Sequence, residues 1–593
     1  MSRVRSIALI ATGLAGLALL LSGVPVDPAV KFDRAIRDWS RHPTTSSVRA
    51  LVRVNRNRGS AIADLIRARS GSVVGSVQPD LIVADLTPAA LSAVAQDPGV
   101  TRISADALVH TLGSVLTNDV LLNTEALLPR SYTGTGITVA VIDSGILPNA
   151  NMKVAATYDF VVKNGSKVGA LDPYGHGTHV TGLIASNGTT SNDLYESIAP
   201  GVKLIALRAL DQNGSGYTSG VINAINFAVA NKKALSIDVI NLSLGHPVYE
   251  SATTDPLVQA VENAVAAGIV VVASAGNFGG DPTTHVPGYG GITSPGNAPD
   301  AITVGAIETN GTVTRDDDTV AWFSSRGPTW YDGFQKPDLL APGSHLVSDV
   351  PTSSTLARSY PNGLMKTSGT TNLMKLSGTS MSAGVVTGVV SLMLQASLKN
   401  FPGSVLTPNA VKAILQYTAF PMDDQDLLTQ GAGALNAAGA VALAAAIDPT
   451  RPVGSWWLST GVNAWTTVGS TSLAWGQRVV WGDRVVWGNQ VYSNDPAWAL
   501  RVVWGDRVVW GNRVVWGNST VWDDGNPGVW GSRVVWGNSL LGQVDGTSVT
   551  WGSLSPYVTA DRVVWGDVSS LNIAPTALSW GNLERANDDL TAK

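Results

Sequence analysis

Between residues 134 and 448, short and nearly continuous apolar runs alternate with longer segments of helical periodicity. The runs cover residues 137–142, 238–242, 269–273 and 301–306. Apolar residues recur at helical spacing over residues 219–230, 255–267 and 410–417, and Thr407 and Pro408 form a typical helix start. Strands that are apolar on both faces belong to parallel sheets covered by helices on both sides. The pattern therefore predicts an α/β domain with a mostly parallel sheet and helices on both faces.

A smaller unit precedes this domain, over residues 32–110. Its patterns predict strands over residues 48–54, 81–86 and 101–109 and helices over residues 60–68 and 88–95. We expect a separate α+β domain, with the larger domain covering residues 118–448.

The composition changes abruptly after residue 450. Sixteen of the nineteen tryptophans lie in residues 451–593. The motif Arg-Val-Val-Trp-Gly, mostly followed by Asp or Asn, begins at Arg478, Arg484, Arg501, Arg507, Arg513, Arg533 and Arg562. Residues 451–593 are therefore predicted to form a separate β-rich repeat region.

Two arrangements fit the six-residue period of these repeats. Gly-Asp and Gly-Asn are typical two-residue hairpin turns, so a meander would place Trp481 opposite Arg484, with a cation–π contact on one side of the sheet. A parallel solenoid would instead place Trp481 on Trp487 and bring like charges into register. We favour the meander, with a role in surface binding, assembly or secretion.

The first 24 residues have the pattern of an export signal. Arg3 and Arg5 precede an uncharged apolar run over residues 7–21. The run has fifteen residues, whereas a membrane span needs about twenty. Val24 stands where a lipoprotein would have its lipidated cysteine. We expect a cleaved signal peptide, a secreted protein and no stable membrane span.

The composition excludes several classes of function. The net charge is −5 and no block of like charge occurs, which gives no electrostatic footprint for nucleic acid. The chain has no cysteine, so it has no disulfide, thiolate nucleophile or cysteine-ligated zinc.

Four polar residues stand at the ends of predicted elements in the larger domain. Asp143 follows a buried strand, His176 opens a helix within Gly-His-Gly-Thr-His-Val, Asn277 follows another strand, and Ser380 opens a long apolar helix. Each alone would be read as a capping, packing or turn residue. Together they supply a nucleophile, a base, a carboxylate and an amide at one edge of a sheet, where α/β domains bind their ligands.

The two histidines of this motif also raise the possibility of a metal site. His176 and His179 are three residues apart, but no third histidine or paired carboxylate follows at ligand spacing. No metal ligand is assigned from the sequence.

The four motifs resemble those of the subtilisin family of serine peptidases, in the same chain order. Val-Ile-Asp-Ser-Gly contains Asp143, Gly-His-Gly-Thr-His-Val contains His176, Ala-Gly-Asn contains Asn277 and Gly-Thr-Ser-Met-Ser contains Ser380. The resemblance covers about 310 residues. It implies a subtilisin-like fold and a serine endopeptidase that cleaves polypeptides without a cofactor for its chemistry.

The resemblance also implies a role for each residue. Ser380 would be the nucleophile, His176 the general base, Asp143 the residue that orients the imidazole, and Asn277 an oxyanion-hole donor. An extended substrate would pair as a strand between two segments of the chain, which form the two rims of the cleft. The first substrate side chain would enter a pocket between the second of these rims and a third segment. These segments are Gly214, Ser215 and Gly216; Ser243, Leu244 and Gly245; and Ser274, Ala275 and Gly276.

Some features depart from the family pattern or extend it. Gly384 replaces the usual proline after the serine motif, and residues 351–375 are longer than typical and expected to be a mobile loop at the cleft. Asn151 stands where a calcium-binding aspartate often occurs, and the loop of residues 187–196 also differs, so structural calcium is possible. Residues 32–110 resemble the family's inhibitory propeptide, with maturation near residues 110–117. A permanent accessory domain is the alternative.

A different class of function is also open. The peptidase fold could be catalytically inactive and the tryptophan repeats could act as a binding or assembly module. Gly384 favours this alternative and the intact four-part site opposes it.

Overall fold

The computed structural model describes residues 28–111, 131–191, 195–367, 370–450, 461–481 and 484–487, and three short strands at residues 513–515, 533–535 and 562–564. The expected signal peptide and most of the tail lie outside the described residues. The chain divides into two compact units, Met1–Asp106 and Ala107–Lys593.

The N-terminal unit is a four-stranded antiparallel sheet in the order β2-β3-β1-β4, packed with three helices. Three of its elements agree with the predicted ones within a residue: β1 (Val48–Val54), α3 (Gly59–Ala68) and β3 (Leu81–Leu86). A fourth, α4 (Pro88–Gln96), begins as predicted, with Thr87 as its cap. The sequence patterns missed β2 (Ser72–Gln78), in which no residue is buried, and α2 (Arg34–Arg41).

The single strand predicted over residues 101–109 is two strands. β4 (Val100–Ala105) ends the first unit and β5 (Leu108–Thr111) belongs to the second. Asp106 interrupts them, because its buried carboxylate accepts a hydrogen bond from Arg49 Nε at 2.7 Å. Its backbone N–H also donates to the carbonyl of Arg49.

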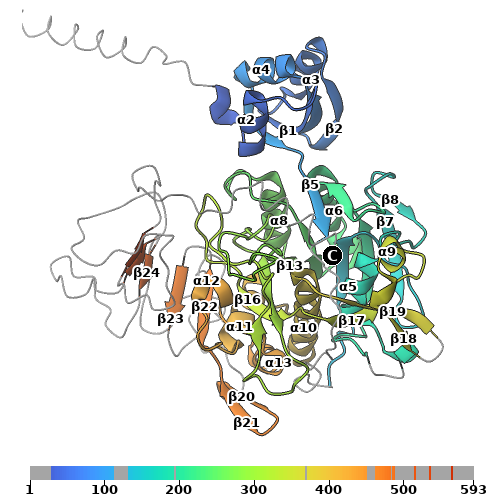
Figure 1. The fold of residues 1–593 in the computed structure, drawn as a ribbon, viewed down its shortest axis with the longest axis vertical. Helices are drawn as coiled ribbons and strands as arrows, with labels where there is room; N and C mark the ends of the chain where they lie inside the picture. Colours follow the sequence, from blue (N-terminus) through green and yellow to red (C-terminus); the bar gives the residue numbers. More distant parts are fainter. Residues whose placement is uncertain are drawn as a thin grey trace, which may run out of the picture. The chain divides into compact units, whose positions relative to one another are not determined.

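The second unit is built on a nine-stranded sheet within the described residues (Figure 1). The order is β15-β14-β13-β11-β6-β9-β7-β8, with β16 on β14, and every pair is parallel except those of the edge strands β15 and β8. This confirms the predicted α/β class. The strands are β6 (Thr138–Asp143), β7 (Val154–Asp159), β8 (Ser166–Val168), β9 (Lys203–Arg208), β11 (Val239–Leu242), β13 (Val270–Ser274), β14 (Ile302–Glu308), β15 (Thr319–Val320) and β16 (Leu339–Pro342).

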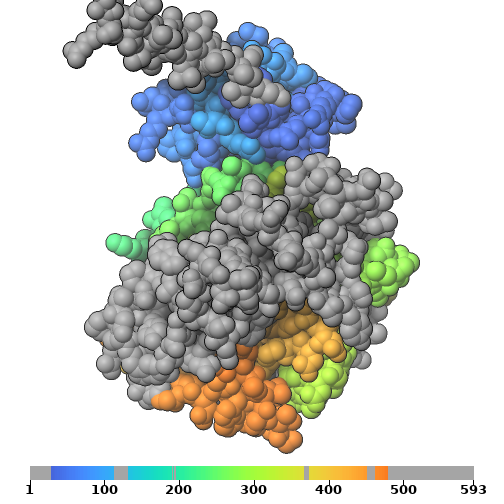
Figure 2. All heavy atoms as spheres, turned by 90° about the vertical axis from the view of Figure 1, so that its left-hand side faces the viewer, coloured from blue at the N-terminus to red at the C-terminus, as the bar shows by residue number. Residues whose placement is uncertain are grey.

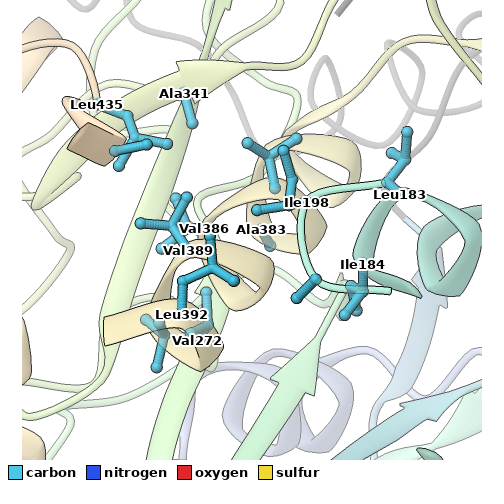
Figure 3. Close-up of a cluster of buried hydrophobic side chains, with 14 of the residues drawn as sticks. Leu183, Ile184, Ile198, Val272, Ala341, Ala383, Val386, Val389, Leu392 and Leu435 are labelled. Carbon is cyan, nitrogen blue, oxygen red and sulfur yellow. The ribbon is translucent and has the colours of Figure 1, made fainter. Parts of the chain in front are cut away.

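The central strands present different residues to the two faces of the sheet. Val270 and Val272 of β13 join a buried cluster with α10 (Thr379–Asn400) and α5 (His176–Ala185). Figure 3 shows Val272 among Val386, Val389 and Leu392 of α10. The alternate residues of β13 are equally buried on the other side, where α8 (Pro256–Ala266) and α6 (Thr218–Ala230) pack. Burial on both faces explains why these strands are continuously apolar.

The helix α10 is the core helix of this unit. Among the described residues it alone is long and apolar enough to cross a membrane, but 89% of that apolar window is buried inside the protein. Gly384 lies where α10 meets α5, and a Cβ there would be 3.2 Å from the carbonyl of Val180. The replacement of the family's usual proline by Gly384 therefore affects the packing of α10 against α5.

The segment before the serine motif, expected to be a mobile loop, contains regular secondary structure in its described residues. It contains β17 (Leu346–Asp349), α9 (Thr355–Ser359), β18 (Leu364–Thr367) and β19 (Thr370–Leu376), and its three strands form a sheet in the order β17-β19-β18. Leu356 and Ala357 of α9 join the main core cluster. Burial of these apolar side chains fixes the segment against the domain.

The apolar core of the second unit continues beyond residue 448. The hairpin of β20 (Trp465–Val468) and β21 (Thr471–Ala474) leads to Trp475, which is buried against α11 (Pro408–Thr418) and α13 (Ala437–Ala446). Figure 2 shows this hairpin in deep orange at the molecular surface. Trp475 Nε1 donates to Thr466 Oγ1 at 2.8 Å, which satisfies its polar atom.

The described part of the repeats begins with a hairpin. β22 (Arg478–Trp481) pairs antiparallel with β23 (Arg484–Trp487), and Trp481 is opposite Arg484. The predicted hairpin register is confirmed for this pair. β24 (Arg513–Val515) pairs antiparallel with β25 (Arg533–Val535), which pairs in parallel with β26 (Arg562–Val564). These distant pairings differ from a simple meander of consecutive hairpins.

Candidate active site

Three neighbouring parallel strands end at the site. Leu242 of β11 is paired with Ile142 of β6 on one side and with Ala273 of β13 on the other. The next residues along the three strands are Asp143, Ser243 and Ser274. This register brings the segments that contain Asp143, Ser243 and Asn277 to the same edge of the sheet.

Asp143 and His176 are in direct contact. His176 Nδ1 is 2.9 Å from both carboxylate oxygens of Asp143, and both side chains are buried. The contact requires a close approach of α5 to the end of β6. A Cβ at Gly177 would collide with the backbone oxygen of Gly145, so glycine is needed there.

A second carboxylate, Asp172, holds the beginning of α5, and no sequence motif pointed to it. Asp172 accepts hydrogen bonds from the backbone N–H groups of Gly175 and Thr178, from Thr178 Oγ1 and from Ser144 Oγ, at 2.6 to 2.8 Å. Burial raises the pKa of Asp172, and these four donors oppose the rise.

Ser380 lies in the first turn of α10 and is fully buried. Its Oγ donates to the carbonyl of Ser243 at 3.0 Å, and Ser243 Oγ donates to the carbonyl of Ser380 at 2.9 Å. This reciprocal pair joins the start of α10 to the end of β11. Among the described residues, His176 Nε2 has no hydrogen-bond partner, so it is available as an acceptor.

Asn277 is oriented by the residue before Ser380. The backbone N–H and the hydroxyl of Thr379 both donate to Asn277 Oδ1 at 3.0 Å. The Thr379 hydroxyl also accepts from the backbone N–H of Gly276 at 3.1 Å. These contacts to the amide oxygen fix the orientation of the Asn277 side-chain amide.

The two histidines of the motif have separate partners. His179 is fully buried and its Nε2 bonds to the carbonyl of Met374 at 2.9 Å. Burial lowers the pKa of His179 to about 3, so the ring is neutral at ordinary pH. No group of three or more His, Cys, Asp or Glu side chains suited to a metal occurs in the part of the chain that the structure describes.

The strand β5 lies between the two predicted substrate rims. It pairs antiparallel with β10 (Ser215–Tyr217) on one side and with β12 (Leu244–Gly245) on the other. His110 is opposite both Ser215 and Gly245, Thr111 is opposite Leu244, and the Thr111 N–H donates to the carbonyl of Gly214 at 3.2 Å. A segment of the chain itself thus occupies the place predicted for an extended peptide.

Thr293 lies against both segments predicted to form the walls of the first pocket, and no sequence motif pointed to it. A Cβ at Gly245 would be 2.7 Å from Thr293 Oγ1, and one at Gly276 would be 2.9 Å from Thr293 Cγ2. The Thr293 N–H donates to the carbonyl of Ala275 at 3.0 Å. Thr293 therefore contacts both predicted walls of the pocket.

The region expected for calcium contains an amide–carboxylate cluster. The side-chain amides of Asn149 and Asn151 donate to Asp349 Oδ1 at 2.7 and 2.6 Å. Burial raises the pKa of Asp349, and the hydrogen bonds oppose this rise. These donors satisfy Asp349 Oδ1, whereas Asp349 Oδ2 is buried and has no hydrogen-bond partner among the described residues. Calcium stays a prediction from the resemblance.

Comparisons with known proteins agree with the observed fold. A model described as "Subtilase family" matches residues 134–441. Serine protease AprX of Bacillus subtilis (strain 168) is 36% identical over 365 residues, which are 60% of this chain and 78% of that protein. Subtilisin E of the same organism is 33% identical over 293 residues, which are 49% and 68% of the two chains. The crystal structure of fervidolysin from Fervidobacterium pennivorans, a keratinolytic enzyme related to subtilisin, has a TM-score of 0.53 and 23% identity, and covers 69% of this chain and 62% of that one.

Proposed function

Because the chain belongs to the subtilase family and is a serine-type endopeptidase, we propose that it cleaves peptide bonds with Ser380, His176 and Asp143 as its catalytic triad. The observation that carries this assignment is the contact of His176 Nδ1 with both oxygens of Asp143, at the sheet edge where Ser380 Oγ donates to the carbonyl of Ser243. Asn277 completes the site as the oxyanion donor. Hydrolysis of the peptide bond by these residues needs no cofactor. Structural calcium is a separate expectation.

The reaction begins when the Ser380 hydroxyl rotates from the Ser243 carbonyl to His176 Nε2, which is without a partner in the described residues. His176 takes the proton as Ser380 Oγ attacks the scissile carbonyl, and Asp143 stabilises the imidazolium that results. The negative oxygen of the tetrahedral intermediate is bound by Asn277 Nδ2 and the Ser380 N–H at the start of α10. His176 then protonates the leaving amine, and water hydrolyses the acyl-enzyme by the same route.

Residues 32–110 act in this proposal as an inhibitory propeptide, and the chain cuts itself after β5. Ser243, whose carbonyl contacts Ser380, is one residue before Leu244, which is opposite Thr111. Because the two strands of an antiparallel pair run in opposite directions, Ser243 would be opposite the residue after Thr111. We therefore expect cleavage after residue 112, within the region of residues 110–117 indicated by the sequence.

The other assignments stay proposals from the sequence. Residues 1–24 would export the chain, so that the mature enzyme is secreted and acts on polypeptides outside the cell. Residues 118–448 would form the peptidase domain, whose core extends to Trp475, and the repeats from Arg478 onward would have a binding or assembly role. No nucleic acid and no membrane span are part of the proposal.

A fluorophosphonate probe and the mass of the mature chain test the proposal together. The probe should label the protein stoichiometrically on Ser380, and intact-mass analysis should show a mature form that begins at Gly113. An unlabelled but folded protein would favour the inactive binding module. A labelled protein whose mature chain starts well outside residues 111–118 would support the triad assignment but contradict the cleavage position inferred from the register of β5.

Replacing Asn277 by alanine should lower kcat about 10²- to 10³-fold with little change in KM, a magnitude measured on subtilisin itself. The amide would bind the oxygen only when it carries the negative charge of the transition state. Steady-state kinetics on a peptide substrate provide the measurement. Asn400→Ala, which removes an exposed amide at the far end of α10, is the matched control. An equal loss in both variants would contradict the oxyanion role.

A further inference from the structure

The connection between β16 and β17 is bonded to the serine motif. Its residues, 343–345, follow the last residue of β16 and precede the first residue of β17. The carbonyl of Gly343 accepts a hydrogen bond from the N–H of Gly378, the N-cap residue of α10, at 2.8 Å. The N–H of His345 donates to Ser377 Oγ at 2.7 Å. Two hydrogen bonds therefore hold the backbone that leads into α10.

His345 has a left-handed backbone, with a φ of +60°. A Cβ makes this conformation unfavourable, so it persists where neighbouring contacts hold the residue. The side chain is buried, and its Nδ1 is 3.0 Å from Ser344 Oγ and 3.3 Å from Glu308 Oε1. The hydrogen bond with His345 holds the pKa of Glu308 below its usual value, against the rise that burial would cause. The contact with Glu308 therefore helps to hold His345 in its left-handed conformation.

Glu308 belongs to the central sheet. It is the last residue of β14, and the residue before it, Ile307, is paired with Pro342 of β16. The N–H of Gly343 donates to the carbonyl of Ile307 at 3.1 Å. The connection is thus joined to β14 twice, by this backbone hydrogen bond and by the side chains of Glu308 and His345.

We propose that His345 is a positioning residue for the nucleophile Ser380, and that Glu308 holds it in place. His345 acts through its backbone N–H on Ser377, three residues before the nucleophile. The proposal rests on the proposed peptidase function, because it concerns the alignment of that nucleophile. Ser380 Oγ must reach the scissile carbonyl in a fixed geometry, and a misplacement of about 1 Å can reduce the rate about 10²-fold. The rims and pocket walls proposed for the substrate are other segments, so loss of the Glu308 contact should lower kcat rather than raise KM.

Glu308→Ala tests this role without altering the backbone of His345. The variant should have a kcat about 10-fold lower and a KM within about 2-fold of the wild-type value. Glu308→Gln, whose side-chain oxygen can still accept from the imidazole, should recover most of the lost kcat. Steady-state kinetics on a peptide substrate give both constants. Titration with a fluorophosphonate counts the active sites, so that inactive protein does not enter kcat.

Asp317→Ala is the matched control. Asp317 is in the loop that follows β14, where it accepts a hydrogen bond from Thr312 Oγ1 at 2.7 Å. This variant should keep the wild-type kcat. Equal values of kcat in Glu308→Ala and Asp317→Ala would overturn the proposal. A change confined to KM would also overturn it, because it would indicate a role in substrate binding.

Two substitutions at His345 separate the side chain from the backbone. Asparagine and glycine both tolerate the left-handed conformation and keep the N–H that bonds to Ser377. Only the asparagine amide can still donate to Glu308, so His345→Asn should keep most of the activity and His345→Gly should lose kcat as Glu308→Ala does. Combining His345→Gly with Glu308→Ala should add little further loss, because both remove the same contact. Fully additive losses would show that the two residues act independently and would overturn the proposal.

The wild-type protein distinguishes this proposal from the proposed function. A wild-type protein that neither reacts with the fluorophosphonate nor cleaves the peptide would refute the peptidase function itself. An active wild-type enzyme whose kcat is unchanged by Glu308→Ala would refute the role of His345 alone.

Discussion

Replacing Ser380 by alanine should reduce kcat about 10⁶-fold, the loss measured for the nucleophile of subtilisin, and should leave the chain at its unprocessed length. Without the hydroxyl no acyl-enzyme can form, and the residual rate comes from binding and the oxyanion donors alone. Hydrolysis of a peptide substrate and intact-mass analysis of the purified protein measure the two effects.

Ser382→Ala is the matched control. Ser382 is two residues away on the same helix, is equally buried, and donates to the carbonyl of Ala341 at 3.1 Å. It should remain processed and active, because it lies outside the proposed machinery. Undiminished processing of purified Ser380→Ala protein would mean that another protease matures the chain.

The sequence predicted the features of the fold that depend on neighbouring residues in the chain. The fold class followed from runs such as residues 269–273, because burial on both faces leaves no polar alternation. The start of α11 was likewise predictable, since Thr407 caps it and Pro408 occupies its first turn. The hairpin register of Trp481 and Arg484 followed from turn chemistry alone.

Contacts between distant segments were not predictable in the same way. Thr293 looks like an ordinary loop residue, and its position depends on its contacts with Gly245 and Gly276. The division of the strand over residues 101–109 depended on the contact of Asp106 with Arg49, 57 residues away in the chain. The motifs thus located the site residues along the chain, whereas their partners required the fold.

The peptidase unit contains a buried charge cluster that neither the motifs nor the proposed mechanism uses. Asp338 accepts a hydrogen bond from Lys336 Nζ at 2.8 Å and forms an ion pair with Lys412 Nζ at 3.0 Å, and both lysines are fully buried. Gln416 Nε2 and the Thr303 N–H complete the shell of the carboxylate. One carboxylate therefore compensates two buried ammonium groups that link β16, α11 and the segment before β14.

Replacing Asp338 by asparagine should destabilise the peptidase unit by about 3 to 5 kcal/mol, because it leaves buried charges without their partner. Unfolding is best followed by calorimetry in the Ser380→Ala background, where autolysis cannot occur. Asp316→Asn, which removes an exposed carboxylate of the same unit, should change stability by less than about 0.5 kcal/mol. A loss for Asp338→Asn as small as that of the control would contradict the role of the cluster.

The loss of stability caused by Asp338→Asn should also depend on pH. Burial lowers the pKa of Lys336 to about 7, below its usual 10.5, so the unfolded chain binds more protons than the folded one between these values. Stability from this group therefore rises as pH increases from about 7 to 10.5. Removing Asp338 should lower the pKa of Lys336 in the folded protein further, so that Lys336 loses its proton more easily. The loss of stability caused by Asp338→Asn should therefore be largest below pH 7 and smaller near pH 9. Glu262, whose pKa burial raises to about 8, has the opposite trend, but it is present in both proteins and largely cancels in their difference. A loss that is constant from pH 6 to 9 would show that the lysine stays charged without its carboxylate.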